Sequence, residues 1–416
     1  MIYIPFIWFI LLLFYILKRK KRLEISALIT IAYVITSFFA IVIDVKQIYG
    51  AAGVVQTTIN LTPTLLYCFL ITLTILPFIK LPTFRRENGI RIRNLELFNI
   101  IFYFYFGVFV LFVFFFGKEI IYKVQNPDIA GLRLLIVEGE DDLGFSNYTG
   151  VLRIIARLVF IFGSSAMFLH VFYFYSIAFL TRSAIFNIGI LIFSGMPIMI
   201  GMLSLDRSKV IYWIMSFIAV AVFFWHSIDS SKKKGIKSTF ILFLCVFGAY
   251  LTVITLARYG EQDIGAENSL IIYAGQSFHN FCLFYDKLNL PGISLEHVTP
   301  VLNSIFGSSD DISRADLYSH SIDTQVFASF SGMMIREIGV WGSVMYSFLY
   351  FVIASLLLRK IRNYNITNIV LVVILLYIPY FGIFGLYYSS LDRELAVWGI
   401  LILSYFLNKR KPDLLR

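Results

Sequence analysis

Long apolar runs separated by short charged segments make up most of this chain. The runs approach the roughly 20 residues that an α-helix needs to cross about 30 Å of hydrocarbon. This pattern predicts an all-α, polytopic integral membrane protein with about eleven transmembrane helices. The predicted spans cover residues 2–17, 25–45, 62–79, 97–116, 154–180, 186–204, 209–227, 239–257, 338–358, 368–388 and 394–407.

Lysines and arginines gather in short clusters at the ends of these runs. The cluster at 18–22 follows an apolar stretch, whereas a signal peptide carries its cations before it, so residues 2–17 are interpreted as a retained span. With the N-terminus outside, most of the 35 Lys and Arg fall in the inner connections and in the tail after residue 407. The positive-inside rule therefore predicts an outer N-terminus and a cytoplasmic C-terminus.

A long polar segment, residues 259–337, interrupts the succession of spans. Its carboxylates outnumber its lysines and arginines, and it holds three of the five histidines. The predicted orientation makes it a large extracytoplasmic loop with short helices. Residues 1–258 then form eight spans with a smaller outer loop at 117–149, and residues 338–416 form three spans and the tail.

Within the polar segment, residues 270–285 are apolar enough to be mistaken for a twelfth span. They include Gln276 and His279, and a crossing here would move the basic clusters at 359–362 and 409–411 to the outside. Apolar residues recur at helical spacing, so we interpret the stretch as a helix that lies on the bilayer surface or is tucked against the bundle.

Composition narrows the classes of function. The chain is 59% hydrophobic and only 14% charged, and its net charge of +10 is accounted for by the clusters at span ends, so no nucleic-acid surface is indicated. No Walker loop, dinucleotide fingerprint, or zinc or calcium spacing is present, so no cofactor or metal is expected. The acidic run at 138–142 lacks the ligand spacing of a calcium loop and is interpreted as solvated.

Arginines near the predicted outer edge of the membrane are the first candidates for chemistry. Arg207 stands in a turn with room for little except Asp206, Arg207 and Ser208, and Arg258 closes the eighth span. A guanidinium is permanently charged and forks onto phosphate oxygens, so arginines at this level suit a lipid-linked pyrophosphate.

At these residues the chain begins to resemble a family. The run Gly201-Met-Leu-Ser-Leu-Asp-Arg207-Ser-Lys-Val resembles the arginine-bearing turn of O-antigen ligases and Wzy-type polysaccharide polymerases. His320-Ser321, followed by Glu337-Ile-Gly-Val-Trp-Gly342, is similar to the family's loop histidine and its Glu-x-Gly-x-x-Gly motif. The 17 residues from His320 to Glu337, and Ser-Leu-Asp in place of Thr-Gly-Ser before the arginine, favour the divergent polymerases over the ligases.

The resemblance implies a GT-C-like fold and an inverting, metal-independent glycosyltransferase. Such an enzyme transfers a glycan from an undecaprenyl-diphosphate donor to a hydroxyl of a second lipid-linked glycan, on the outer face of the bacterial plasma membrane, to build O-antigen or capsular polysaccharide. It implies protein partners as well, namely a chain-length regulator and a flippase.

The resemblance also implies roles for particular residues. Arg207 would bind the pyrophosphate with Arg258, Arg314 and Arg336 as supporters. His320 or a loop carboxylate would receive the proton of the acceptor hydroxyl. Glu337 would orient His320 or an arginine, or would simply cap the start of its helix.

Two other classes of function stay open. A flippase or polysaccharide exporter is one, although charges at span ends and the lack of an internal repeat are atypical of transporters. An acyltransferase would need a histidine within a span, and only His170 and His226 qualify. We interpret His170 as a packed or hydrogen-bonded core residue, and His279 and His297 as structural.

Overall fold

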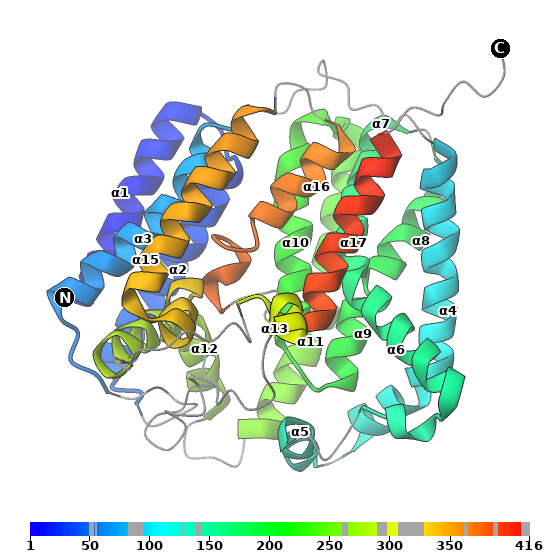
Figure 1. The fold of residues 1–416 in the computed structure, drawn as a ribbon, viewed down its shortest axis with the longest axis horizontal. Coiled ribbons are helices and arrows are strands. Elements are labelled where there is room, and N and C mark those ends of the chain that lie inside the picture. Colours follow the sequence, from blue (N-terminus) through cyan, green and yellow to red (C-terminus); the bar gives the residue numbers. More distant parts are fainter. Residues whose placement is uncertain are drawn as a thin grey trace. The chain divides into compact units, whose positions relative to one another are not determined.

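The computed structural model of the chain describes residues 1–49, 54, 56–81, 95–126, 128–138, 143–180, 182–259, 265–288, 298–306, 328–361, 365–385 and 390–408. Throughout these ranges the regular structure is helical (Figure 1). The chain divides into two compact units, which are described separately.

Eight helical stretches in the described part of the chain are long and apolar enough to cross a membrane. They are Ile25–Lys46, Leu61–Ile79, Leu95–Gln125, Gly150–Phe179, Ala184–Leu203, Ser208–Ser227, Ser230–Thr252 and Phe330–Arg359. This confirms the prediction of an all-α, multi-pass membrane protein. The remaining three predicted spans also overlap helices. The helix Ile366–Leu375 is only ten residues long, and the helices Tyr3–Lys20 and Leu391–Asn408 each carry three charged residues near one end. The count of eleven spans therefore stays a prediction.

The first unit comprises Met1–Thr83, Ile264–Arg362 and Ile374–Glu394. Its core forms where α1 (Tyr3–Lys20), α2 (Ile25–Lys46) and α3 (Leu61–Ile79) pack together and α15 (Phe330–Arg359) packs along α3 (Figure 1). Phe9 and Tyr67 meet edge to face in this core, where both rings are buried. The elements of the unit are α1 (Tyr3–Lys20), α2 (Ile25–Lys46), α3 (Leu61–Ile79), α12 (Gly265–Lys287), α13 (Pro300–Phe306), α15 (Phe330–Arg359) and the 3₁₀ helix η5 (Phe381–Ile383).

Helix α12 contains residues 270–285, the apolar stretch of the polar segment. It packs closely on α2, since a Cβ at Gly275 would lie 2.5 Å from the carbonyl carbon of Phe39. Phe278 and Phe281 bury their rings against Tyr67 of α3. The helix is therefore tucked against the bundle, which is one of the two placements that the sequence predicted, and it is not among the eight apolar stretches.

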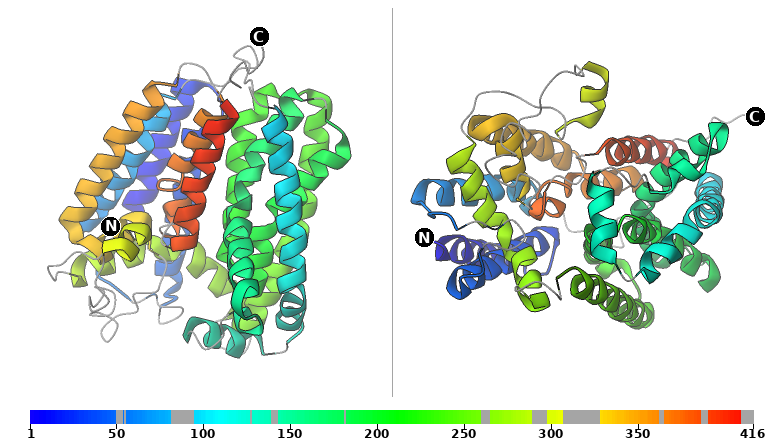
Figure 2. Two further views of the ribbon diagram at one scale, coloured as in Figure 1. Left: turned by 45° about the vertical axis from the view of Figure 1, so that its right-hand side comes forward. Right: turned by 90° about the horizontal axis from the view of Figure 1, so that it is seen from below.

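The second unit comprises Phe84–Asp263, Asn363–Val373 and Leu395–Arg416. Its helices, mostly cyan to green, run roughly along one direction in Figure 2. Trp213 lies at the centre of an aromatic cluster with Phe217, Phe243 and Phe247. The elements are α4 (Leu95–Gln125), α5 (Ile129–Glu138), η2 (Phe145–Asn147), α6 (Gly150–Ser165), η3 (Ala166–Phe168), α7 (Leu169–Phe179), α8 (Ala184–Ser194), α9 (Met196–Leu203), α10 (Ser208–Phe224), η4 (Trp225–Ser227), α11 (Ser230–Tyr259) and most of α16 (Ile366–Leu375) and α17 (Leu391–Asn408).

Several helices extend beyond the predicted spans. Helix α4 continues to Gln125, α11 begins at Ser230 and α15 begins at Phe330. Hydropathy finds only the apolar part of a helix. In α4 and α11 the added residues include lysine, glutamate and glutamine, whose good helix propensity continues the backbone hydrogen bonding past the apolar run. Part of the predicted outer loop 117–149 is consequently helical.

Candidate functional site

The turn that carries Arg207 is held in one conformation by its own polar groups. The Asp206 amide donates to the Gly201 carbonyl at 2.8 Å, and the Asp206 carboxylate accepts from both the amide and the hydroxyl of Ser208 at 2.9 Å. Asp206 thus caps the first turn of α10. Leu205 takes a left-handed conformation with φ 49°, and a Cβ at Gly201 would lie 2.8 Å from the Asp206 carbonyl oxygen, so the tight turn requires glycine there.

Arg207 follows this cap, and its side chain is turned into the protein. Only 7% of the residue is exposed, and its Nη1 donates to the Thr255 hydroxyl of α11 at 2.8 Å. Thr255 in turn donates to the Leu251 carbonyl at 2.6 Å, which fixes its oxygen as an acceptor for the guanidinium. A charge at the end of predicted spans that is almost removed from solvent usually has a functional reason.

A second arginine contacts the same turn, and the sequence analysis missed it. Arg133 of α5 donates from Nη1 to the Ser204 carbonyl at 2.8 Å, and α5 also packs on α11. The turn at 204–208 is therefore contacted by the Arg133 guanidinium from α5, while its own Arg207 reaches to Thr255 of α11. The available signal was a lone arginine within the apolar run of residues 129–137.

Arg336 and Glu337 form a buried ion pair in the first unit. Both Nε and Nη2 of Arg336 lie 2.6 Å from Oε1 of Glu337, with 4% of the arginine and none of the glutamate exposed. Both nitrogens of the arginine lie against the same oxygen of its neighbour's carboxylate, a close contact between opposite charges. The resemblance gives Glu337 either His320 or an arginine as its partner, and in the structure it contacts Arg336.

The Glu-x-Gly-x-x-Gly motif forms a sharp bend within α15. Gly339 has φ 74° and ψ 177°, which is not helical, and the Ser343 hydroxyl donates to the Ser331 carbonyl at 3.1 Å across twelve positions. Such a contact is impossible along one straight helix, where twelve residues span about 18 Å. A Cβ at Gly342 would lie 2.7 Å from an Ile338 side-chain carbon, so the bend brings the second glycine close to the chain before it.

The expectation that Glu337 stands at a helix start is wrong. The helix begins at Phe330, and Glu337 lies at the end of its first segment, next to the bend. The first segment, from Phe330 to the bend at Gly339, is too short for hydropathy to distinguish from the polar segment before it.

Two of the predicted site residues are in direct contact. Arg336 and Glu337 contact each other in the first unit, and Arg207 lies in the second. Arg258 belongs to α11, but the structure does not describe its side chain. Arg314 and His320 lie outside the described residues.

Two histidines have the structural roles expected of them. His170 is buried, with Nδ1 3.0 Å from the Ser216 hydroxyl and its ring edge-to-face with Trp213. His279 of α12 places Nε2 3.0 Å from the Ala40 carbonyl, which only accepts, so the proton is on Nε2. Burial lowers the pKa of His279 and keeps the ring neutral. His297 lies outside the described residues.

Within the described ranges no cluster of three or more His, Cys, Asp or Glu side chains is arranged to hold a metal ion. Among the described residues, Arg207 is a nearly buried guanidinium, and Arg133 contacts the turn that carries it. Comparisons with known proteins add no assignment: no family model, curated protein or solved structure matches the chain.

Proposed function

We propose that this chain is a membrane glycosyltransferase that polymerises undecaprenyl-diphosphate-linked oligosaccharide repeat units on the outer face of the bacterial plasma membrane. The proposal rests on the resemblance of the Arg207 turn, and on the order of spans and polar loop along the chain. Eleven spans and the outer N-terminus are parts of the same proposal.

The observation that carries it is the burial and fixation of Arg207. Its hydrogen bond to the Thr255 hydroxyl holds the nearly buried guanidinium in one position. When the glycosidic carbon leaves the lipid, the bond to the pyrophosphate oxygen breaks and negative charge grows on that oxygen. A guanidinium fixed beforehand stabilises this charge without reorganisation.

The second requirement is removal of the acceptor proton. The acceptor oxygen forms the new bond at the anomeric carbon with inversion, and its proton goes to a base. We assign this role to His320, and assign Glu337 to orientation, because its carboxylate is already engaged by Arg336. Arg314, Arg258 and Arg336 are the proposed supporters of the pyrophosphate.

Turnover by the purified protein tests the proposal. The protein is given an undecaprenyl-diphosphate-linked repeat unit of its own pathway, and products are resolved by size. We expect a ladder of lipid-linked glycans that Arg207→Ala abolishes, that Arg207→Lys weakens, and that persists in Arg157→Ala, which removes an exposed arginine of α6. His320→Ala then tests the base.

A transporter of lipid-linked oligosaccharide is the second candidate. The division of the chain into two compact helical units favours it, because alternating access requires bundles that move as separate bodies. If the folded wild-type protein makes no ladder from the correct unit, the polymerase proposal fails. Flipping of the same lipid across proteoliposomes would then support the transporter.

A further inference from the structure

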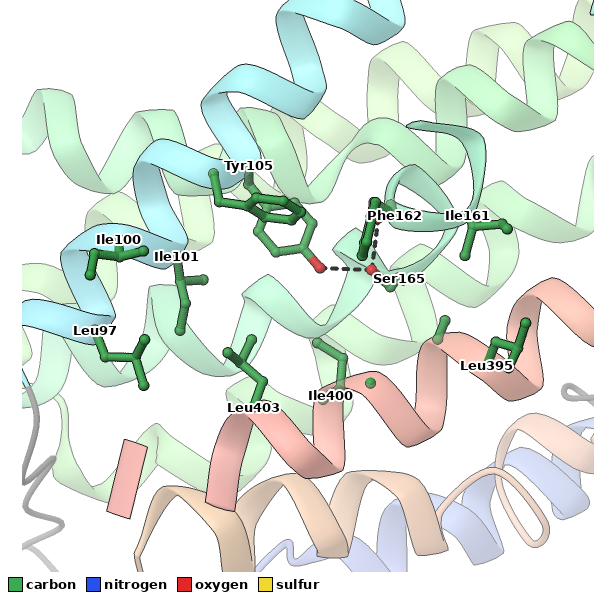
Figure 3. Close-up of a pocket in the computed structure, with 13 residues that line it drawn as sticks. Leu97, Ile100, Ile101, Tyr105, Ile161, Phe162, Ser165, Leu395, Ile400 and Leu403 are labelled. Carbon is green, nitrogen blue, oxygen red and sulfur yellow. Dashed lines mark hydrogen bonds between the residues drawn. The ribbon is translucent and has the colours of Figure 1, made fainter. Parts of the chain in front are cut away.

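A cavity of about 330 Å³ lies within the second unit, between α4, α6 and α17 (Figure 3). Leu97 and Leu403 line one end, and Ile161 and Leu395 line the other. The walls are almost entirely aliphatic and aromatic, so the cavity suits an apolar occupant.

The two hydroxyl groups in the wall are satisfied by the protein itself. Ser165 donates its hydroxyl hydrogen to the Phe162 carbonyl at 2.7 Å, so in the 2.7 Å contact with Tyr105 the tyrosine must be the donor (Figure 3). Both hydroxyl hydrogens are therefore used within the wall. A polar headgroup would find no hydroxyl donor here, and its desolvation would be uncompensated.

The cavity is continuous with the exposed apolar surface of the same helices. Ile100 and Phe104 line it from α4, yet 59% and 43% of these residues are exposed, and Leu395 of α17 is 42% exposed. Because α4 and α6 belong to stretches able to cross a membrane, this surface faces lipid hydrocarbon. Bilayer lipid is the material at the mouth of the cavity.

The shape fits a chain that runs along the helices. Lining positions 395, 396, 399, 400 and 403 form one face of α17 and extend about 12 Å along its axis. Gly399 lies in the middle of this face, and a Cβ built there meets no atom within 4 Å. The missing side chain leaves room on the cavity side of the helix.

We propose that this cavity binds one acyl chain of a bilayer phospholipid, whose headgroup stays outside. The chain enters sideways from the bilayer and packs against α4, α6 and α17, so the lipid holds α17 to the two other helices. This site is independent of the proposed transferase chemistry.

Photolabelling tests the site. The protein is reconstituted in nanodiscs that contain a phospholipid with a diazirine on one acyl chain, and adducts are mapped to peptides by mass spectrometry. We expect adducts on the buried lining residues Ile101, Tyr105 and Ile400, which bulk lipid does not reach. Gly399→Leu should remove most of them by filling the cavity, and Gly399→Ala should remove fewer.

Matched controls separate occupancy from folding. Gly107 of α4 also has open space around its Cβ and does not line the cavity, so Gly107→Leu should leave the cavity adducts unchanged. Labelling at Ile185 of α8, which is 84% exposed, should be the same in every variant that folds. Equal cavity labelling in Gly399→Leu and wild type overturns the proposal. Displacement of the acyl label by a small mole fraction of undecaprenyl diphosphate overturns the phospholipid assignment in favour of a polyprenyl chain.

Discussion

Arg336 and Glu337 are neighbours in sequence that bury their charges against each other. Removing one partner of a buried ion pair leaves an uncompensated charge, and we expect Glu337→Met to destabilise the protein by about 3–5 kcal/mol. The double variant Arg336→Met/Glu337→Met should lose less stability than the sum of the two single variants. Unfolding of the four proteins in detergent, analysed as a double-mutant cycle, measures this coupling. Additive effects would mean that the two side chains do not stabilise each other.

Arg133 offers a prediction about the arginine turn that rests on the proposed function. Its contact with the Ser204 carbonyl restrains the turn that presents Arg207, and hydrogen bonds to charged groups contribute about 1.5–3 kcal/mol. Arg133→Ala should weaken binding of the lipid pyrophosphate, raising KM by about tenfold or more, if that energy is expressed in binding.

Arg133→Lys keeps a donor and should recover part of the loss, whereas Arg157→Ala, at an exposed position, should change little. Steady-state kinetics over a range of repeat-unit concentrations checks the result. An unchanged KM in Arg133→Ala would remove the residue from the site. Absence of turnover in the wild-type protein would instead contradict the proposed function.

At the scale of elements, the bend in α15 depends on the backbone of Gly339. Its φ of 74° with ψ of 177° is a conformation that glycine alone adopts readily, and strain of this kind costs about 1–3 kcal/mol. Gly339→Ala should therefore lower the unfolding temperature. Gly107→Ala, in the open surroundings of α4, should leave it unchanged or raise it, because alanine is the better helix former. Equal effects of the two substitutions would show that the bend does not depend on glycine.

The elements also show what the sequence can and cannot predict. Apolar runs located the helices well, since burial in hydrocarbon depends on composition over about 20 residues. The same signal could not place the bend at Gly339, the early start of α15 at Phe330 or the contact of Arg133, because these depend on local backbone conformation and on tertiary contacts between distant segments. For the candidate site, Arg207 was identified as a residue, but its partner Thr255 was not.

At the scale of the whole molecule, contacts between distant segments agree with the prediction that successive connections lie on opposite sides of the membrane. Lys20 donates to the Leu81 carbonyl at 2.7 Å, and Lys232 donates to the Ile177 carbonyl at 2.8 Å, and each contact joins groups predicted at the inner side. The contact of Arg133 with Ser204 joins two groups predicted at the outer side. The absolute orientation rests on the distribution of Lys and Arg, and accessibility can test it.

Cysteine labelling decides the orientation. The three native cysteines are free, with Cys245 exposed, so they are first replaced by serine. Single cysteines are then introduced at Gln125, at the end of α4, and at Ser230, at the start of α11, where both side chains are exposed. In spheroplasts, a membrane-impermeant maleimide should label Gln125→Cys and spare Ser230→Cys, and both should react after solubilisation. The reverse pattern would place residues 259–337 in the cytoplasm, where an outer-face polymerase could not use them.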